Sequence, residues 1–190
     1  AGFLFLPFHM RGYRKLDDFQ KRNRDLILPN IEYITDSITR IDPEAKLVTT
    51  EHSGNYPYDF LVSALGSRVV PESIDGLAER LGEGRKVHTF YTPDGAMRLA
   101  RALDEFNGGD LVINIAEMPI KCPVAPIEFA CLAEDYLRKK GLRGKTRITL
   151  VTPLSGAFTK PVCNEVLTDV ITEKKDIKVV PDFLLESVND

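Results

Sequence analysis

Strand-like and helix-like apolar patterns alternate through the second half of the chain. Strands are expected at 87–91, 110–116, 146–152 and 177–180, and helices at about 93–107, 126–140 and 160–174. Thr92-Pro93-Asp94 is a typical helix start, and Gly108-Gly109 closes the first helix. Such alternation is typical of βαβ units, whose strands are parallel and whose crossovers are right-handed. The sequence therefore predicts a Rossmann-like parallel sheet.

The first half has a different pattern. Residues 12–28 have helical spacing that ends at Pro29, and short β-branched runs follow at 31–34, 37–41, 46–50 and 58–64. Turn residues separate these runs, which predicts a small antiparallel meander. The last run, DFLVSALGS, is continuously apolar and ends in a glycine, which predicts a buried strand whose backbone lies close to another group.

The predicted fold class is therefore α/β, with two regions. Residues 1–75 hold a helix, the meander and the last apolar strand, and residues 76–190 hold the Rossmann-like domain, with a linker near 71–84. A length of 190 residues allows one good core or two small ones.

Charge and composition exclude several classes of protein. The net charge is −3, whereas proteins that bind nucleic acid usually carry a clustered basic excess, so no nucleic-acid partner is expected. The basic run between Arg11 and Arg24 is interrupted by aspartates, which favours a solvated helix face over a phosphate or lipid-headgroup patch. No stretch approaches the roughly 20 apolar residues needed to cross a bilayer. The opening AGFLFLPFHMRGYR has its basic residues after its apolar ones, unlike a signal peptide.

Three cysteines are too few and too far apart for a disulfide scaffold or a zinc site, so a reducing, cytoplasmic compartment is expected and no metal. His9, His52 and His88 have no cysteine or carboxylate at motif spacing. Cys131 and Cys163 fall at helical spacing with apolar residues, which favours packing for both.

The loop after the strand 110–116 is where ligands bind in such sheets. A dinucleotide-binding loop would carry G-x-G-x-x-G, yet no glycine lies between Gly109 and Gly141. An acidic residue that would hold the ribose is also missing, because the next strand ends in Thr152-Pro153. Both absences argue against nicotinamide binding.

This loop, EMPIKCPVAP, carries a thiol instead. Cys122 lies next to Lys121 and near the positive end of the 126–140 helix, and both effects favour the thiolate, which is the reactive species. Three prolines stiffen the segment. The alternative is a small buried residue without chemistry. Glu128, in the first turn of the helix, either stabilises the helix dipole or handles protons near a reduced acceptor.

Three segments resemble, in order, the sulfide:quinone oxidoreductases and the related flavocytochrome c sulfide dehydrogenases. They are YDFLVSALGSR at 58–68, MPIKCPVAPIEFA at 118–130 and LVTPLSGAFTKPV at 150–162, and PFHMRGYRK at 7–15 also fits. The first is common to flavoprotein disulfide reductases. The second is much more specific, because Cys-Pro-x-x-Pro-x-Glu replaces the NAD motif.

The resemblance implies FAD-dependent oxidation of sulfide to sulfane sulfur or polysulfide, with electrons passing through flavin to quinone. Cys122 would be one of two redox cysteines and Glu128 the glutamate of the same loop. Ala64, Gly66 and Arg68 match the strand end that lies against FAD, so 1–75 would be part of an FAD-binding domain. The family also docks peripherally on membranes. Separately from the resemblance, surface left exposed by missing strands makes a homodimer an open expectation.

Several features of the family are missing from the sequence. These are the G-x-G-x-x-G that binds FAD, the partner cysteine and the C-terminal amphipathic helices. The chain is therefore expected to be an internal segment that retains no FAD and is inactive alone. Two alternatives stay open: a relative of type II NADH dehydrogenase or another pyridine nucleotide-disulfide reductase, and a noncatalytic Rossmann-like interaction module with an inert Cys122.

Overall fold

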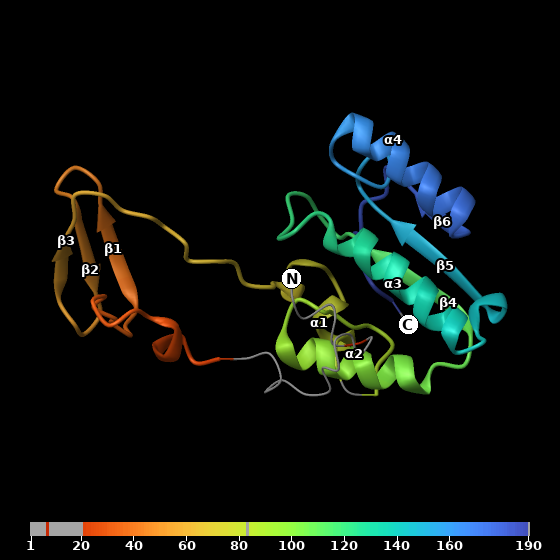
Figure 1. Cartoon of the computed structure of the whole chain (residues 1–190), viewed down its shortest axis with the longest axis horizontal. Coiled ribbons are helices and arrows are strands. Elements are labelled where there is room, and N and C mark those ends of the chain that lie inside the picture. The colour runs from red at the N-terminus through yellow and green to blue at the C-terminus, as the bar shows by residue number, and fades with distance from the viewer. Residues whose placement is uncertain (1–6, 8–20, 83, 190) are drawn as a thin grey trace. The chain divides into compact units, whose positions relative to one another are not determined.

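The structure is a computed structural model that describes residues 7, 21–82 and 84–189 (Figure 1). The described residues form two compact units, one within Phe19–Ser67 and the other from Arg68 onward. The prediction of an α/β fold with an antiparallel and a parallel sheet is confirmed.

The larger unit contains the parallel sheet. Strands β4 (Gly109–Asn114), β5 (Thr146–Val151) and β6 (Ile177–Val180) pair in that order, and all neighbours are parallel. Helix α3 (Ala125–Lys139) connects β4 to β5. Helix α4 (Pro161–Asp169), continued by the π-helical turn η7 (Val170–Lys174), connects β5 to β6 (Figure 1). The predicted βαβαβ order is therefore present.

Helix α2 (Pro93–Glu105) precedes the sheet and begins as the sequence predicts. The Thr92 hydroxyl accepts a hydrogen bond from the Gly95 amide at 3.1 Å, which satisfies one of the free amides of the first turn. Four apolar side chains on one face are buried: Ala96, Leu99, Ala100 and Leu103. Shorter helical segments are η5 (Pro71–Ser73), α1 (Leu77–Arg80) and η6 (Arg143–Lys145).

The predicted strand at 87–91 is wrong. Only Val87 makes a β-bridge, with Leu81, and the next four residues form no strand. Ring packing takes the place of a sheet here, because Phe90 stacks on Phe129 of α3 at 5.0 Å between ring centroids. The apolar pattern thus marks a contact with a helix.

The core of the larger unit lies between the sheet and its helices. Fully buried side chains come from α3, β5, η7 and β6, among them Leu137, Ile148, Leu150, Ile171 and Ile177. Burial of such side chains is the main source of stability for a unit of this size.

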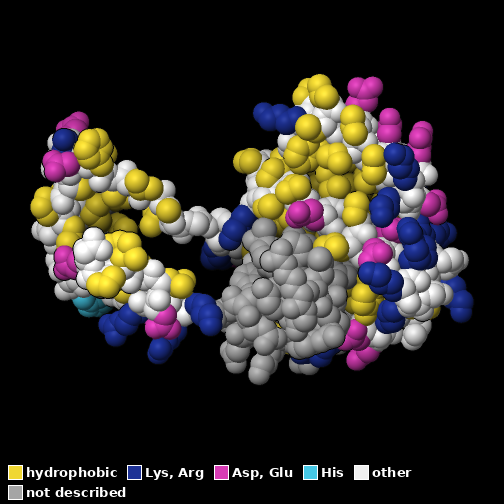
Figure 2. All heavy atoms as spheres, in the orientation of Figure 1, with side chains coloured by type: hydrophobic (Ala, Val, Ile, Leu, Met, Phe, Trp, Pro, Cys, Tyr) yellow, Lys and Arg dark blue, Asp and Glu magenta, His cyan; other side chains and the backbone are white. Residues whose placement is uncertain are grey.

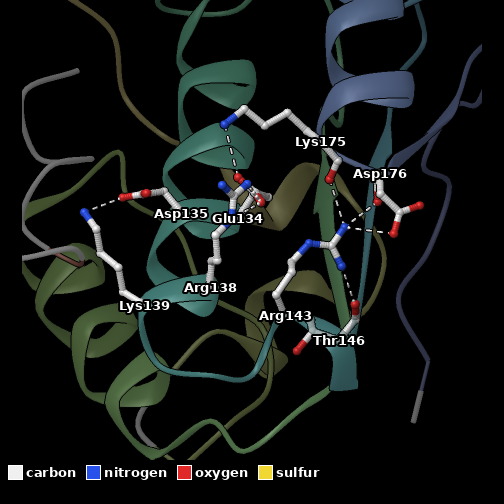
Figure 3. A network of polar contacts seen from close by, with 8 residues as sticks. All are labelled: Glu134, Asp135, Arg138, Lys139, Arg143, Thr146, Lys175 and Asp176. Atoms are coloured by element: carbon white, nitrogen blue, oxygen red, sulfur yellow. Dashed lines mark hydrogen bonds and ion pairs between the residues drawn. The ribbon is translucent and has the colours of Figure 1, made fainter.

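A buried carboxylate joins α3 to the end of η7 (Figure 3). Glu134, whose side chain is 3% exposed, accepts hydrogen bonds from Arg138 and from Lys175 Nζ, the latter at 3.1 Å. Desolvation alone would raise the pKa of Glu134, but these hydrogen bonds and positive charges outweigh it and hold the pKa below its usual range.

A second arginine, Arg143, holds the beginnings of β5 and β6 together. The Arg143 guanidinium donates to the carbonyls of Thr146, Lys175 and Asp176 at 2.9, 2.9 and 2.6 Å (Figure 3). These carbonyls lie where β5 begins and just before β6, so one side chain holds the entry to both strands.

The smaller unit is an antiparallel meander, as predicted, but its third strand lies at 55–57 and not at 58–64. Strands β1 (Ile38–Asp42), β2 (Leu47–Thr50) and β3 (Asn55–Pro57) are antiparallel neighbours. Asp36 holds the β2–β3 turn, because its carboxylate accepts hydrogen bonds from the backbone amides of His52 and Ser53 at 2.9 and 2.6 Å. Desolvation would raise the pKa of Asp36, but these hydrogen bonds hold it far below its usual range.

Two predicted strands and most of a predicted helix differ from the structure. Residues 31–34 and 58–64 form no strand, because no described strand lies beside them to pair with their backbone. The apolar side chains of the second segment are exposed, with Phe60 at 94%, and hydrophobic side chains are visible along it (Figure 2).

The helix predicted at 12–28 lies largely outside the described residues. Within its described part only η4 (Asn23–Leu26) is helical, as one 3₁₀ turn without a buried side chain. None of the helices in the described part of the chain combines the length and apolarity needed to span a membrane.

Candidate active site

The candidate site is the loop 115–124, which follows β4 and leads into α3. The Ile115 amide donates to the Val151 carbonyl at 2.9 Å, so strand pairing continues one residue past β4 before the loop begins. The loop therefore leaves the sheet at the carboxyl end of β4, where ligands bind in sheets of this type.

Cys122 is half-buried in this loop and has a positive backbone φ of 63°. Its carbonyl accepts a hydrogen bond from the amide of Ala125, the first residue of α3, at 3.0 Å. This turn attaches the cysteine to the amino end of α3, where the helix dipole places partial positive charge. Positive φ is uncommon outside glycine, so the turn holds the cysteine backbone in a defined conformation. Lys121, its neighbour, is exposed.

Tyr91 lies near Cys122 and was not predicted as a site residue. Its ring stacks on Phe90 at 5.0 Å, and Phe90 in turn stacks on Phe129 of α3. The Tyr91 hydroxyl is buried and has no hydrogen-bond partner among the described residues. Burial raises the pKa of Tyr91, and the electrostatic effect of the nearby Cys122 raises it further. The phenol therefore stays protonated and is a hydrogen-bond donor without an acceptor.

Glu128 is half-buried in the first turn of α3, as predicted. Its backbone amide donates to the Val124 carbonyl at 3.0 Å, and its carboxylate forms no hydrogen bond or ion pair within the described chain. The helix dipole favours an acidic side chain at this position. The structure thus places Glu128 six residues after Cys122 at the same end of α3, in a position compatible with both predicted roles.

The other two cysteines differ from each other. Cys131 is half-buried, and burial raises the pKa of its thiol, with Lys175 lowering it and Glu134 raising it. Cys163 is exposed, so the prediction that it packs was wrong. The reason is that α4 buries none of its own residues, and its apolar positions near Cys163 face solvent in the described chain. All three thiols are free.

The residues predicted to lie against FAD belong to an exposed segment. Ala64 and Gly66 form no regular structure, and an added Cβ at Gly66, where φ is 77°, would meet no atom within 4 Å. Arg68 donates to Glu72 Oε1 at 2.7 Å. The positive φ and the open space are compatible with close approach of another group to the Gly66 backbone.

Known proteins resemble this chain in sequence and in structure. No protein-family model matches the chain. A mitochondrial sulfide:quinone oxidoreductase of Dictyostelium discoideum is 28% identical over 158 residues, which cover 83% of this chain and 35% of the relative. The crystal structure of the sulfide:quinone oxidoreductase from Aquifex aeolicus superposes with a TM-score of 0.71 at 26% identity, covering 99% of this chain and 43% of that one.

The chain is a homologue of the sulfide:quinone oxidoreductases. It spans about a third of the length of the curated relatives it matches. An NADH dehydrogenase-like protein of Mycobacterium tuberculosis is also similar, 33% identical over 73% of this chain and 36% of the relative. The chain thus has oxidoreductase relatives that differ in the electron donor that their names give.

Proposed function

We propose that the chain is part of an FAD-dependent sulfide:quinone oxidoreductase and that Cys122 is one of its two redox cysteines. The observation that carries the proposal is the position of Cys122, which stands in the loop after β4 where a dinucleotide-binding domain has its glycine-rich turn. The homology to sulfide:quinone oxidoreductases supports the same assignment.

The overall reaction would oxidise sulfide sulfur by two electrons to sulfane sulfur and reduce a quinone to its quinol. Hydrosulfide would attack a disulfide between Cys122 and a partner cysteine, forming a persulfide on one sulfur and releasing the other as a thiolate. The amino end of α3 would stabilise a thiolate at Cys122. The Tyr91 hydroxyl, a donor without an acceptor, would hydrogen-bond to charge that develops there. Glu128 would accept the proton of the incoming sulfide.

FAD would supply the two-electron acceptor that links sulfide to quinone. Ala64, Gly66 and Arg68 are the residues of this chain proposed to lie against it, because the segment 58–68 resembles the flavin-contacting strand of the family. Its exposed apolar side chains would then be covered in the whole protein. Residues 1–75 would form part of the FAD domain and 76–190 the second domain. The whole protein would act as a peripheral protein on the cytoplasmic side of a quinone-bearing membrane.

The test is sulfide-dependent reduction of a soluble quinone by the flavin-loaded protein that contains this chain. Cys122→Ser should lower the rate by about a thousand-fold, since removal of a nucleophile has effects of that order or larger. Cys163→Ser is the matched control, because its thiol is free and exposed, and should leave the rate within about two-fold. An unchanged rate in Cys122→Ser would contradict the proposal.

A second candidate is an NADH dehydrogenase, favoured by the similarity to the M. tuberculosis protein. The same assay distinguishes the two when NADH replaces sulfide as the donor. We expect no NADH-driven rate above background, because no glycine lies between Gly109 and Gly141 to admit a pyrophosphate. Faster quinone reduction with NADH than with sulfide would favour this alternative.

A further inference from the structure

A cleft of about 390 Å³ lies between α2 and the loop that precedes it, away from the Cys122 loop in sequence. Arg98, Arg101 and Glu105 line it from one face of α2, at helical spacing. Arg85 and His88 line it from the loop. The β-bridge between Leu81 and Val87 holds the two ends of this loop together. Two separate elements therefore bring cationic side chains into one concave surface.

Two arginines that line the cleft have no acidic partner among the described residues. Neither Arg85 nor Arg98 forms an ion pair with a described carboxylate, whereas Arg40 and Arg147 on the protein surface each pair with an aspartate, at 2.7 and 2.6 Å. Arg85 and Arg98 therefore bring two guanidinium groups without a described carboxylate partner to one cleft, and such groups are typical of sites for anions.

His88 supplies an independent observation. Its ring is half-buried, and Nδ1 is buried without a hydrogen-bond partner among the described residues. Burial lowers the pKa of His88, the positive charge of Arg98 lowers it further, and a hydrogen bond to the backbone of Arg85 opposes both. A buried ring nitrogen without a partner is costly unless something binds it. His88 lines the cleft, so the negative charge of an anion bound there would favour the imidazolium.

We propose that this cleft binds a small tetrahedral oxyanion between Arg98 of α2 and Arg85 and His88 of the loop. Guanidinium groups match such an anion because two N–H groups can donate to two of its oxygens at once. The same chemistry could come from a free oxyanion, such as phosphate or thiosulfate, or from the phosphate of a nucleotide. The site is independent of the proposed redox function, because it shares no residue with the Cys122 loop.

The experiment is calorimetric titration of the chain with inorganic phosphate, thiosulfate and ADP in separate runs. Saturable binding with one site is expected. Arg98→Gln and Arg85→Gln should each weaken it about ten-fold, as expected for loss of one charged hydrogen bond. Lys86→Gln is the matched control, because it removes the same charge from an exposed residue that neighbours Arg85 but does not line the cleft. Its affinity should stay within about two-fold.

Each further outcome decides the proposal. If ADP binds more than ten-fold tighter than phosphate and shows the same losses in both arginine variants, the site is supported with a nucleotide as its source. If no ligand saturates, or if Lys86→Gln loses as much affinity as Arg98→Gln, the proposal is overturned. If circular dichroism shows that Arg98→Gln is misfolded, the affinity of the Arg85→Gln variant decides the proposal, because Arg85 is exposed. The C2 proton of His88 gives a second readout, because its NMR titration should shift to higher pH with ligand and stay unchanged without a site.

Discussion

The stretches 109–115 and 58–66 both contain a run of apolar residues, yet the first forms a paired strand that buries two of its side chains, whereas the second forms no strand and is exposed. Ile113 in β4 is 7% exposed, whereas Phe60 is 94% exposed. β4 pairs with β5 along six residues, and α3 packs against both strands. No described strand or helix covers the other stretch. The comparison shows that apolar character alone does not make a strand, because the backbone also needs a neighbouring strand to pair with.

The comparison can be broken by removing side-chain volume from each stretch. Ile113→Ala, at a buried position in β4, should lower the free energy of unfolding by about 3 kcal/mol, because it removes buried methyl groups and leaves a cavity. Phe60→Ala removes a larger side chain from the exposed stretch and should change it by less than about 0.5 kcal/mol. Urea unfolding followed by circular dichroism measures both. A loss of more than about 2 kcal/mol in Phe60→Ala would mean that the stretch is packed in solution.

The entry to the sheet depends on Arg143. Arg143→Ala leaves three carbonyls without their donor, so we expect a loss of about 2 kcal/mol in the free energy of unfolding. Arg147→Ala is the control, since its ion pair with Asp110 is exposed and should contribute less than about 1 kcal/mol. Equal losses in the two variants would show that the carbonyl contacts do not hold the strands.

Much of the larger unit follows from local patterns. The Thr92-Pro93 start gave the first residue of α2, and α3, β5 and β6 lie within about two residues of their expected ranges. These elements are bounded by caps, glycines and prolines that act within a few residues. The strands expected at 87–91 and 58–64 are absent, and local sequence could not show this because it does not reveal whether a neighbouring strand is there to pair with.

The candidate site also has features that local sequence predicts and features that it does not. The position of Cys122 in a loop before a helix could be predicted from the glycine-free stretch and its prolines. Its positive φ belongs to the turn closed by the Ala125 amide, and the nearness of Tyr91, some 30 residues earlier, accompanies the packing of Phe90 on α3. Such contacts between distant residues leave no spacing pattern, so Tyr91 carried no signal in the sequence.

The pH dependence of stability sharpens the account of the core. The folded pKa of Glu134 lies below the value of about 4.3 of an unperturbed glutamate, so its contribution is fully present above that pH. It is lost as the pH falls from about 4.3 through the folded pKa. Glu134→Gln should therefore lose less stability than the parent chain between pH 6 and pH 3. Urea midpoints at the two pH values measure this, and the exposed Glu165→Gln should follow the parent chain.

Removal of the Asp36 carboxylate should have the smallest effect of these changes, confined to amide exchange in the meander. Asp36→Ala removes the acceptor of the His52 and Ser53 amides, so both should exchange with deuterium faster. The amides of β4 should be unaffected. Glu51→Ala, next to these residues and exposed, is the control. Unchanged exchange at His52 and Ser53 in Asp36→Ala would show that the carboxylate does not hold the turn.

The central claim is that Cys122 is a redox cysteine, and alkylation of the three free thiols tests it most directly. Exposure alone ranks Cys163 first, because Cys122 and Cys131 are half-buried. The account predicts that iodoacetamide at pH 7 modifies Cys122 fastest, since the proposed redox role requires a nucleophilic sulfur there, and Cys131 slowest, since burial raises the pKa of its thiol. Peptide mass spectrometry over time gives the three rates. A Cys122 that reacts more slowly than Cys163 would contradict the claim.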